Sequence, residues 1–215
     1  MQRTPYRKSD EAAARITSKI QTQFRHNRLA LFDELNVMGV KKHVHKLYQN
    51  VYKVIKKEFE AILNPLYKEI YDEALALGFD GDLRDLDAAW IEEFFDEYNP
   101  VTKYVFSNEM DRKESRLFEA LVATMDSTSA AKMQSYKTAE NLIIRQVKQY
   151  AIDLEDRIAK VVYEDVGVKK VKWVAEHDHR TCGVCSEMDG EVFLLKDAPD
   201  KQHHNCRCYL IPVKE

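Results

Sequence analysis

Apolar residues recur every three or four positions through most of the chain, which is the pattern of amphipathic helices. One run lies between residues 44 and 63 and consists of Val44, Leu47, Tyr48, Val51, Val54, Ile55, Phe59, Ile62 and Leu63. A second run lies between residues 143 and 161 and consists of Ile143, Val147, Tyr150, Ala151, Leu154, Ile158 and Val161. The sequence from about residue 9 to residue 166 therefore predicts a body made of helices.

The first of these helices meets an interruption at Asn64-Pro65. Proline lacks a backbone N–H and crowds the preceding turn, so a break or a kink is expected there. The helical pattern resumes from Leu66 to Leu77, and Gly78 is well placed to end it.

Three further helices are predicted downstream. Asp82 is expected to cap a helix that runs to Tyr98, before Asn99-Pro100. Another helix is expected from about residue 113 to residue 125. A long one follows from about residue 130 to residue 164.

The pattern changes at Gly167. Residues 168–175 alternate Val and Trp with Lys, which predicts a half-buried strand. Residues 192–195 and 209–213 are two more strand candidates, and Asp189-Gly190 supplies a tight turn before the first of them. The predicted fold is therefore mainly α, an elongated helical body with a small C-terminal α+β module.

Three parts follow from this division. Residues 1–128 are the expected helical N-terminal body, residues 129–166 the long helix, and residues 167–215 the module.

The net charge of −3 hides a partition in the body. Residues 1–50 hold 10 Lys and Arg against 4 Asp and Glu, and residues 51–127 hold 9 Lys and Arg against 18 Asp and Glu. Two surfaces with different partners, or merely solvated helix faces, both fit this partition.

Membrane insertion is not expected. No run of 18 apolar residues occurs, and the basic N-terminus lacks the apolar core of a secretory signal. The protein is therefore expected to fold in a cytosol when it is made.

All four cysteines lie in the last 34 residues, in the pattern Cys182-Gly-Val-Cys185, 17 residues, His203-His-Asn-Cys206-Arg-Cys208. Two clusters of thiols and imidazoles are typical of a structural zinc site. A module of about 48 residues buries little apolar surface and usually needs a bound metal ion or another cross-link to be stable. The candidate ligands are Cys182, Cys185, His203, His204, Cys206 and Cys208. We expect Cys182, Cys185 and Cys206 to bind the ion together with either His203 or Cys208.

Other chemistries fit less well. A thioredoxin-like dithiol sits between a strand and a helix, and no helical pattern follows Cys185. His177-Asp178-His179 and His203-His204 beside cysteines suggest a metal-dependent, HNH-like nuclease, but nothing helical follows His204 to carry its second metal-binding histidine. A DNA-binding module that uses the basic residues 1–50 is a third possibility, compatible with a structural role.

The segment from Trp173 onward resembles the C-terminal signature of phage head morphogenesis proteins, the Mu F-like minor head family. That signature is a Trp, Asp-x-Arg-Thr-Cys-x-x-Cys, Asp-Gly and His-x-Asn-Cys-Arg-Cys. Its counterparts here are Trp173, Asp178, Arg180, Thr181, Cys182, Cys185, Asp189, Gly190, His203, Asn205, Cys206, Arg207 and Cys208.

The resemblance implies a minor capsid protein of a tailed bacteriophage, associated with the portal protein inside the procapsid and touching packaged DNA without sequence preference. It implies no catalysis, no small-molecule substrate, and a location in the virion or procapsid after assembly in the host cytoplasm.

Several signature residues have expected roles. Arg180 and Thr181 are expected to anchor the turn into the first half of the metal site, and Asp178 to pair with Arg180 or Arg207. Trp173 is expected to pack over the site. Arg207 is either a solvated charge or a contact to phosphate or to an acidic partner. For the N-terminal half, apolar helix residues are expected to be buried against the portal, among them Ile16, Ile20, Phe24 and Leu31.

Overall fold

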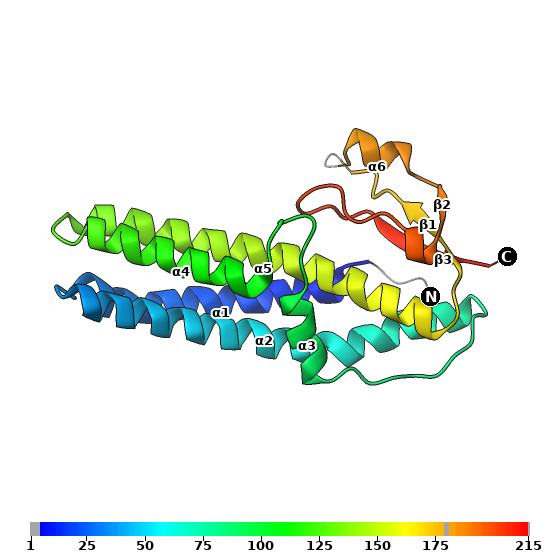
Figure 1. Ribbon diagram of the computed structural model, residues 1–215, viewed down its shortest axis with the longest axis horizontal. Helices are drawn as coiled ribbons and strands as arrows, with labels where there is room; N and C mark the ends of the chain where they lie inside the picture. Colours follow the sequence, from blue (N-terminus) through cyan, green and yellow to red (C-terminus); the bar gives the residue numbers. More distant parts are fainter. Residues whose placement is uncertain (1–4, 179–180, 215) are drawn as a thin grey trace.

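The computed structural model describes residues 5–178 and 181–214 and consists of a long helical bundle with a small sheet at one end (Figure 1). Its main helices are α1 (Arg7–Phe32), α2 (Val37–Ala76), α3 (Ala88–Asp96), α4 (Phe106–Ala123) and α5 (Ser129–Asp165). The prediction of a mainly α fold with a C-terminal α+β part is confirmed.

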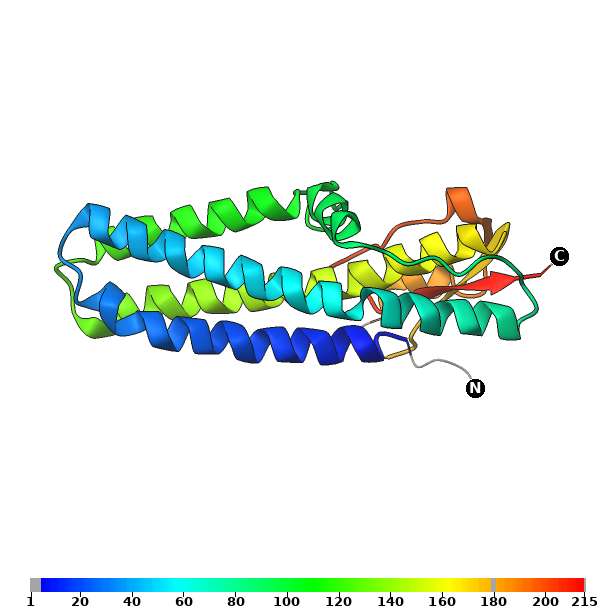
Figure 2. The ribbon, with the colours of Figure 1, turned by 90° about the horizontal axis from the view of Figure 1, so that it is seen from below.

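Four helices, α1, α2, α4 and α5, lie along one another and enclose a single apolar core, while α3 crosses near the middle (Figures 1 and 2). At 1.5 Å per residue, the 40 residues of α2 extend about 60 Å. This length explains the elongated shape, because each helix buries only one stripe of side chains against its neighbours.

Helix α2 runs through Pro65 as one helix, so of the two outcomes expected at Asn64-Pro65, a break or a kink, the break does not occur. Asn64 serves another purpose. Its side-chain amide donates to the carbonyl oxygen of Leu86 at 3.1 Å and accepts from the Leu86 N–H at 2.8 Å. The Asn64 side chain therefore holds the segment between α2 and α3 against α2 and does not end the helix. Gly78, in contrast, follows the helix with φ of 84°, as predicted for its stop.

Helix α3 is shorter than predicted, because Asp87 rather than Asp82 caps it. The Asp87 carboxylate accepts from the Trp90 N–H at 3.1 Å, and residues 79–87 run as an irregular segment. The backbone of this segment is held by other bonds, since the Tyr71 hydroxyl donates to the Gly81 carbonyl at 2.7 Å. More than one Asp before a helix can thus serve as its N-cap. Contacts with residues distant in sequence determine which Asp does so.

Helix α4 begins at Phe106, seven residues before the predicted start. The Phe106 ring is fully buried, with its centroid 4.4 Å from that of Phe95 and 4.6 Å from that of Tyr150. These contacts hold the first turn of α4. Helix α5 agrees with the prediction, and Thr128 caps it through the Ala131 N–H at 3.4 Å.

The sheet contains β1 (Lys170–Val174), β2 (Val192–Leu194) and β3 (Tyr209–Val213), all antiparallel, in the order β2-β1-β3. A short helix, α6 (Gly183–Glu187), and a 3₁₀ turn (Leu195–Asp197) complete this end of the chain. The predicted second strand therefore ends one residue early. Strand β1 joins two apolar clusters, since Val171 belongs to the core of the bundle and Trp173 to a smaller cluster with the cysteines.

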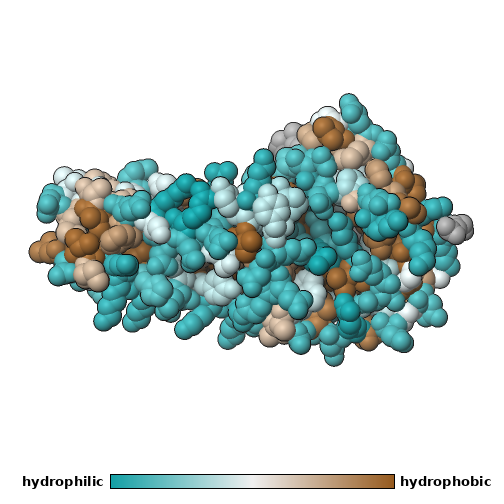
Figure 3. All heavy atoms as spheres, viewed as in Figure 1, coloured by the Kyte–Doolittle hydropathy of each residue, from teal (hydrophilic) through white to brown (hydrophobic). Residues whose placement is uncertain are grey.

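The far end of the bundle, which we call the tip, is formed by the α1–α2 and α4–α5 turns. Hydrophobic side chains gather there at the surface (Figure 3). In the α1–α2 turn, Leu35 is 76% exposed and Met38 69% exposed, and Leu29 and Val37 are exposed as well. Solvent-exposed apolar clusters on a folded protein usually mark a contact surface.

The apolar residues of α1 that were expected to face a partner are instead in the core. Ile16, Ile20, Phe24 and Leu31 are all buried, so the predicted contact surface on this helix is wrong. Helical periodicity identifies an apolar stripe but does not tell whether the same chain covers it.

The charge partition is partly neutralised inside the bundle. Glu58 of α2 forms ion pairs with Arg15 and Lys19 of α1, and Glu69 of α2 pairs with Lys8 at 3.2 Å. Within residues 5–178 and 181–214, no helix has the length and apolar character needed to cross a bilayer.

Candidate metal centre

The first half of the candidate metal centre is built by the start of α6. Cys182 caps this helix, with its sulfur accepting from the N–H of Cys185 at 3.4 Å. Because the helix begins between them, both thiols point to one side of a single turn. The sequence pattern did not predict this helix, which has only five residues.

The second half is brought to α6 by the segment before β3. Ligand atoms of Cys182, Cys185 and His203 lie within 4.8 Å of one another, and so do those of Cys185, Cys206 and Cys208. Cys185 is common to both groups, and its sulfur is 3.6 Å from that of Cys206. Five of the six candidate ligands are thus collected at one place, which can hold a metal ion.

His204 differs from its neighbour. Among the described residues it belongs to neither ligand group, and it is exposed. Its carbonyl oxygen instead lies 3.1 Å from Nδ1 of His203, which can donate to it. In that tautomer Nε2 of His203 carries a free lone pair. This atom is buried and has no hydrogen-bond partner within the described ranges. A buried imidazole nitrogen held in this state by a backbone carbonyl fits a metal ligand.

The thiols are in unequal environments. Burial raises the pKa of Cys185 and of Cys208, while the backbone N–H of Cys185 lowers the pKa of Cys182. Buried thiols resist ionisation in the absence of a cation, and a bound metal ion reverses this preference. The donor set of sulfur and imidazole nitrogen is the one that zinc prefers.

Trp173 packs against the cysteines, as predicted. Its side chain is 2% exposed and lies in one apolar cluster with Ala175, Cys185, Cys206 and Cys208. An aromatic wall of this kind keeps water from the sulfur atoms.

The turn before Cys182 is closed by hydrogen bonds between Asp178 and Thr181. The Thr181 hydroxyl lies 3.3 Å from the Asp178 carboxylate, and it accepts from the Asp178 N–H at 3.1 Å. Arg180, which was expected to share this role, lies outside the described residues.

Asp189-Gly190 forms the predicted turn between α6 and β2. The Asp189 carboxylate accepts from the Ala175 N–H at 2.8 Å and faces Nε2 of His177 at 2.9 Å. The Ala175 N–H is the main reason why the pKa of Asp189 is lowered. Gly190 has φ of 82°, which side chains disfavour, and its N–H donates to the Trp173 carbonyl at 2.9 Å.

Arg207 and Asn205 connect this region to the bundle. Arg207 forms an ion pair with Asp10 of α1 rather than with Asp178, and Arg180, the other expected partner of Asp178, lies outside the described residues. The Asn205 N–H donates to the side-chain carbonyl of Gln149 at 2.6 Å. Signature residues therefore hold the metal region on the helices.

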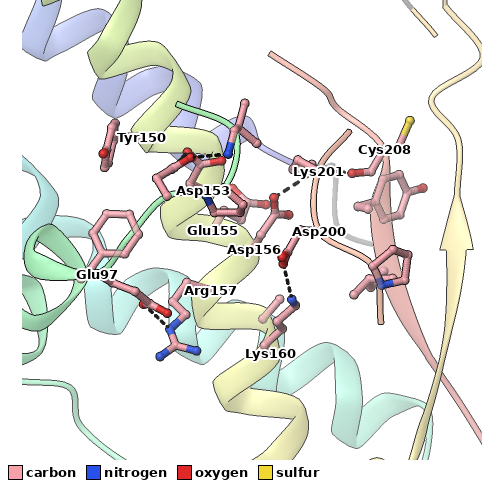
Figure 4. Close-up of a pocket in the computed structure, with 18 of the residues that line it drawn as sticks. Glu97, Tyr150, Asp153, Glu155, Asp156, Arg157, Lys160, Asp200, Lys201 and Cys208 are labelled. Carbon is pink, nitrogen blue, oxygen red and sulfur yellow. Dashed lines mark hydrogen bonds and ion pairs between the residues drawn. The ribbon is translucent and has the colours of Figure 1, made fainter. Parts of the chain in front are cut away.

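Tyr6, which is 1% exposed, makes contacts with the metal region that the sequence pattern did not predict. Its hydroxyl lies 2.7 Å from the carboxylate of Asp156 on α5 and 3.0 Å from the carbonyl oxygen of Cys208, and it can donate its proton to either. Lys201 bonds to the same carbonyl and pairs with Asp156 at 3.1 Å (Figure 4). Tyr6, Asp156 and Lys201 are more than 40 residues apart from one another in sequence, so no spacing pattern signalled this cluster.

The fold and the site together define a helical bundle that carries a Cys/His cluster able to hold a metal ion. Residues 107–211 match the family model described as phage Mu protein F like protein. Over this segment the chain is similar to that family, in agreement with the resemblance seen in the sequence.

A relative in Haemophilus influenzae, described only as an uncharacterized protein, is 28% identical over 120 residues. The match covers 53% of this chain and 27% of that protein, so it spans about a quarter of the relative's length. No solved structure matches the chain.

Proposed function

We propose that this protein is a structural component of the head of a tailed bacteriophage and acts in head morphogenesis, within the procapsid or virion. The observation that carries the proposal is the match of residues 107–211 to the phage Mu protein F like family. The built Cys/His centre inside that segment supports it. We assign it a binding role rather than an enzymatic one.

We also propose that the cluster binds one structural zinc ion through Cys182, Cys185, Cys206 and His203. The buried, unpartnered Nε2 of His203 favours this residue over Cys208 as the fourth ligand. Bound zinc would link α6 to the segment before β3 and stabilise a region with little apolar core of its own. It would act in folding, and no reaction step passes through it.

We infer that the portal protein is a partner and that it contacts the tip of the bundle. The exposed side chains of Leu29, Leu35, Val37 and Met38 form the apolar part of this surface. Basic residues surround them, namely Arg25, Arg28, Lys41 and Lys42, and no ion pair is formed by any of the four within the described ranges. An acidic surface with apolar pockets is the complementary chemistry.

Co-expression with the portal protein of the same phage tests this partner. The chain should co-purify with the portal in moderate salt, because apolar burial does not depend on ion pairs. Leu35→Asp should reduce the recovered complex at least tenfold, since it places a charge in the contact. Leu83→Asp, at a leucine that is 53% exposed outside the tip, is the matched control and should have no effect.

The outcomes separate the two parts of the inference. Failure of the unaltered chain to co-purify rejects the portal as partner. Equal recovery of the Leu35 and Leu83 variants keeps the portal but rejects the tip as the contact surface.

DNA is a secondary partner in this proposal. A groove between α1 and α5 near the tip is lined by Arg25, Arg28 and Lys137 among others. Guanidinium and ammonium groups there suit phosphates and carry no means of reading bases. Contact with packaged DNA would then be weak and independent of sequence.

A further inference from the structure

A cavity of about 150 Å³ separates the metal-binding region from the bundle. It lies between α5, the segment after α3, and the residues on either side of the second ligand cluster (Figure 4). Aromatic rings make up much of its wall, among them Phe94, Tyr98, Tyr150 and Tyr163. Neither the zinc site nor the portal contact uses this space.

Most of the carboxylates around the cavity already have a cation. Glu97 pairs with Arg157 at 3.2 Å, and Asp200 pairs with Lys160 at 3.1 Å (Figure 4). Asp156 is held by Lys201, as described above. These pairs keep the mouth of the cavity close to neutral.

Asp153 has no such cation among the described residues. It faces the cavity from α5, and its two carboxylate oxygens accept only from neutral amides, Asn99 at 2.6 Å and Gln149 at 2.7 Å. Among the described residues, no Lys, Arg or His nitrogen lies within 4.0 Å of it. Burial raises the pKa of Asp153 to about 7, which shows how poorly its negative charge is compensated.

The wall of the cavity complements a cation that carries an apolar chain. Tyr150 lies one turn before Asp153 on α5, and the face of a phenol ring attracts an ammonium group. Phe94 and Tyr98 add apolar surface for methylene groups. A metal ion would need several converging oxygen ligands, whereas one carboxylate among aromatic rings suits a single ammonium group.

We propose that this cavity binds an alkylammonium group, with Asp153 as its counter-ion and the aromatic rings around its methylene chain. The source is either the side chain of a lysine presented by a protein partner or a free aliphatic polyamine. This site is independent of the proposed role in head morphogenesis and of the bound metal.

Calorimetric titration of the full chain tests the proposal with three probes of one chemistry. These are 1,5-diaminopentane, spermidine and a short peptide with a single central lysine, compared with neutral 1-pentanol. The ammonium compounds should bind saturably with one site, and 1-pentanol should not. Tighter binding of the peptide would identify a protein lysine as the natural occupant, and tighter binding of spermidine a free polyamine.

Asp153→Asn tests the role of the negative charge, because it preserves the shape of the side chain. The variant should fold, because it removes an uncompensated buried anion. It should weaken binding of each ammonium probe about tenfold, equivalent to about 1.4 kcal/mol. Glu164→Gln is the matched control, since it removes the same charge from an exposed position on α5 and should leave binding unchanged.

Two results would overturn the site. One is the lack of saturable binding by all three ammonium probes at millimolar concentration. The other is equal affinity of the unaltered chain and the Asp153 variant, which would show that the counter-ion lies elsewhere.

Discussion

His203 and Cys208 occupy different positions relative to the other thiols, although their spacing in the sequence allows either to complete the metal site. His203 groups with Cys182 and Cys185, whereas Cys208 groups with Cys185 and Cys206. Ligand spacing identified all five side chains, but the choice between two of them depends on backbone turns that spacing does not describe. Only the orphaned Nε2 of His203 separates them.

Substitution of single ligands gives a direct test of this choice. His203→Ala and Cys185→Ser should lose most of the bound zinc, because each removes a ligand from a four-coordinate site. Cys208→Ser should retain close to one equivalent. Zinc would be measured by elemental analysis of purified, reduced protein. Retention in the His203 variant with loss in the Cys208 variant would reverse the assignment.

The Asp153 carboxyl predicts a dependence of stability on pH. Its pKa rises from 3.8 to about 7 in the folded state, chiefly through burial, with Asp156 raising it further and Asn99, Gln149 and Lys201 opposing. The folded state therefore holds this proton more tightly than the unfolded state. The resulting stabilisation is fully present below pH 3.8 and is lost as the pH rises through about 7.

Urea denaturation at pH 5.5 and pH 8 measures this effect. Between these values, the unaltered protein should lose about 1 kcal/mol relative to Asp153→Asn, since the full linkage of about 2 kcal/mol is reduced by partial exposure of the group. Glu164→Gln should follow the unaltered protein. Parallel pH profiles for the unaltered protein and the Asp153 variant would show that Asp153 does not titrate in this range.

At the scale of elements, helical periodicity predicted α2 and α5 well because each buries a continuous apolar stripe. It failed where contacts distant in sequence decide the ends. Phe106 starts α4 early by stacking on Phe95, and Asp87 rather than Asp82 caps α3. The sheet was predicted from alternation, but not the division of β1 between two apolar clusters. Because β1 packs on both clusters, removal of the metal should affect β1 less than it affects the ligand segments.

Zinc removal should loosen the ligand segments and leave most of the sheet. Val171 of β1 and Leu195, which follows β2, pack into the core of the bundle, so β1–β3 pairing does not depend on the metal alone. After chelation, hydrogen exchange should accelerate in residues 182–190 and 199–208, and much less in β1. The helical circular dichroism signal should hardly change. Equal acceleration in β1 would mean that the metal-binding region unfolds as one unit.

For the whole molecule, the sequence predicted a bundle and a Cys/His region but not the joint between them. Tyr6, Asp10 and Gln149 contact residues of the metal region that lie 56 or more positions further along the chain. Such contacts have no local signature. The charge partition was also a poor guide to free surface charge, because part of the basic N-terminal surface pairs with Glu58 and Glu69 of α2.

The complete protein should bind DNA weakly and leave it intact. Affinity for duplex DNA should fall steeply between 50 and 200 mM salt, by about 10-fold for every two phosphate contacts that the protein makes. It should depend little on the DNA sequence. Arg25→Gln combined with Arg28→Gln should reduce this slope. Gel analysis after incubation with Mg²⁺, Mn²⁺ or Zn²⁺ should show no cleavage. Cleavage that is lost in a His203 variant would instead support a nuclease.

The position of Tyr6 also constrains the order of events during synthesis. Its hydroxyl contacts the Cys208 carbonyl, and Cys208 is the 202nd residue added to the chain after Tyr6. The start of α1 can bond to Glu155 and Asp156 once α5 has formed, but the Tyr6 side chain can be fully enclosed only after Lys201 and Cys208 have been made. A nascent chain stalled before residue 201 should expose Tyr6 to proteases, and release of the remaining residues should protect it.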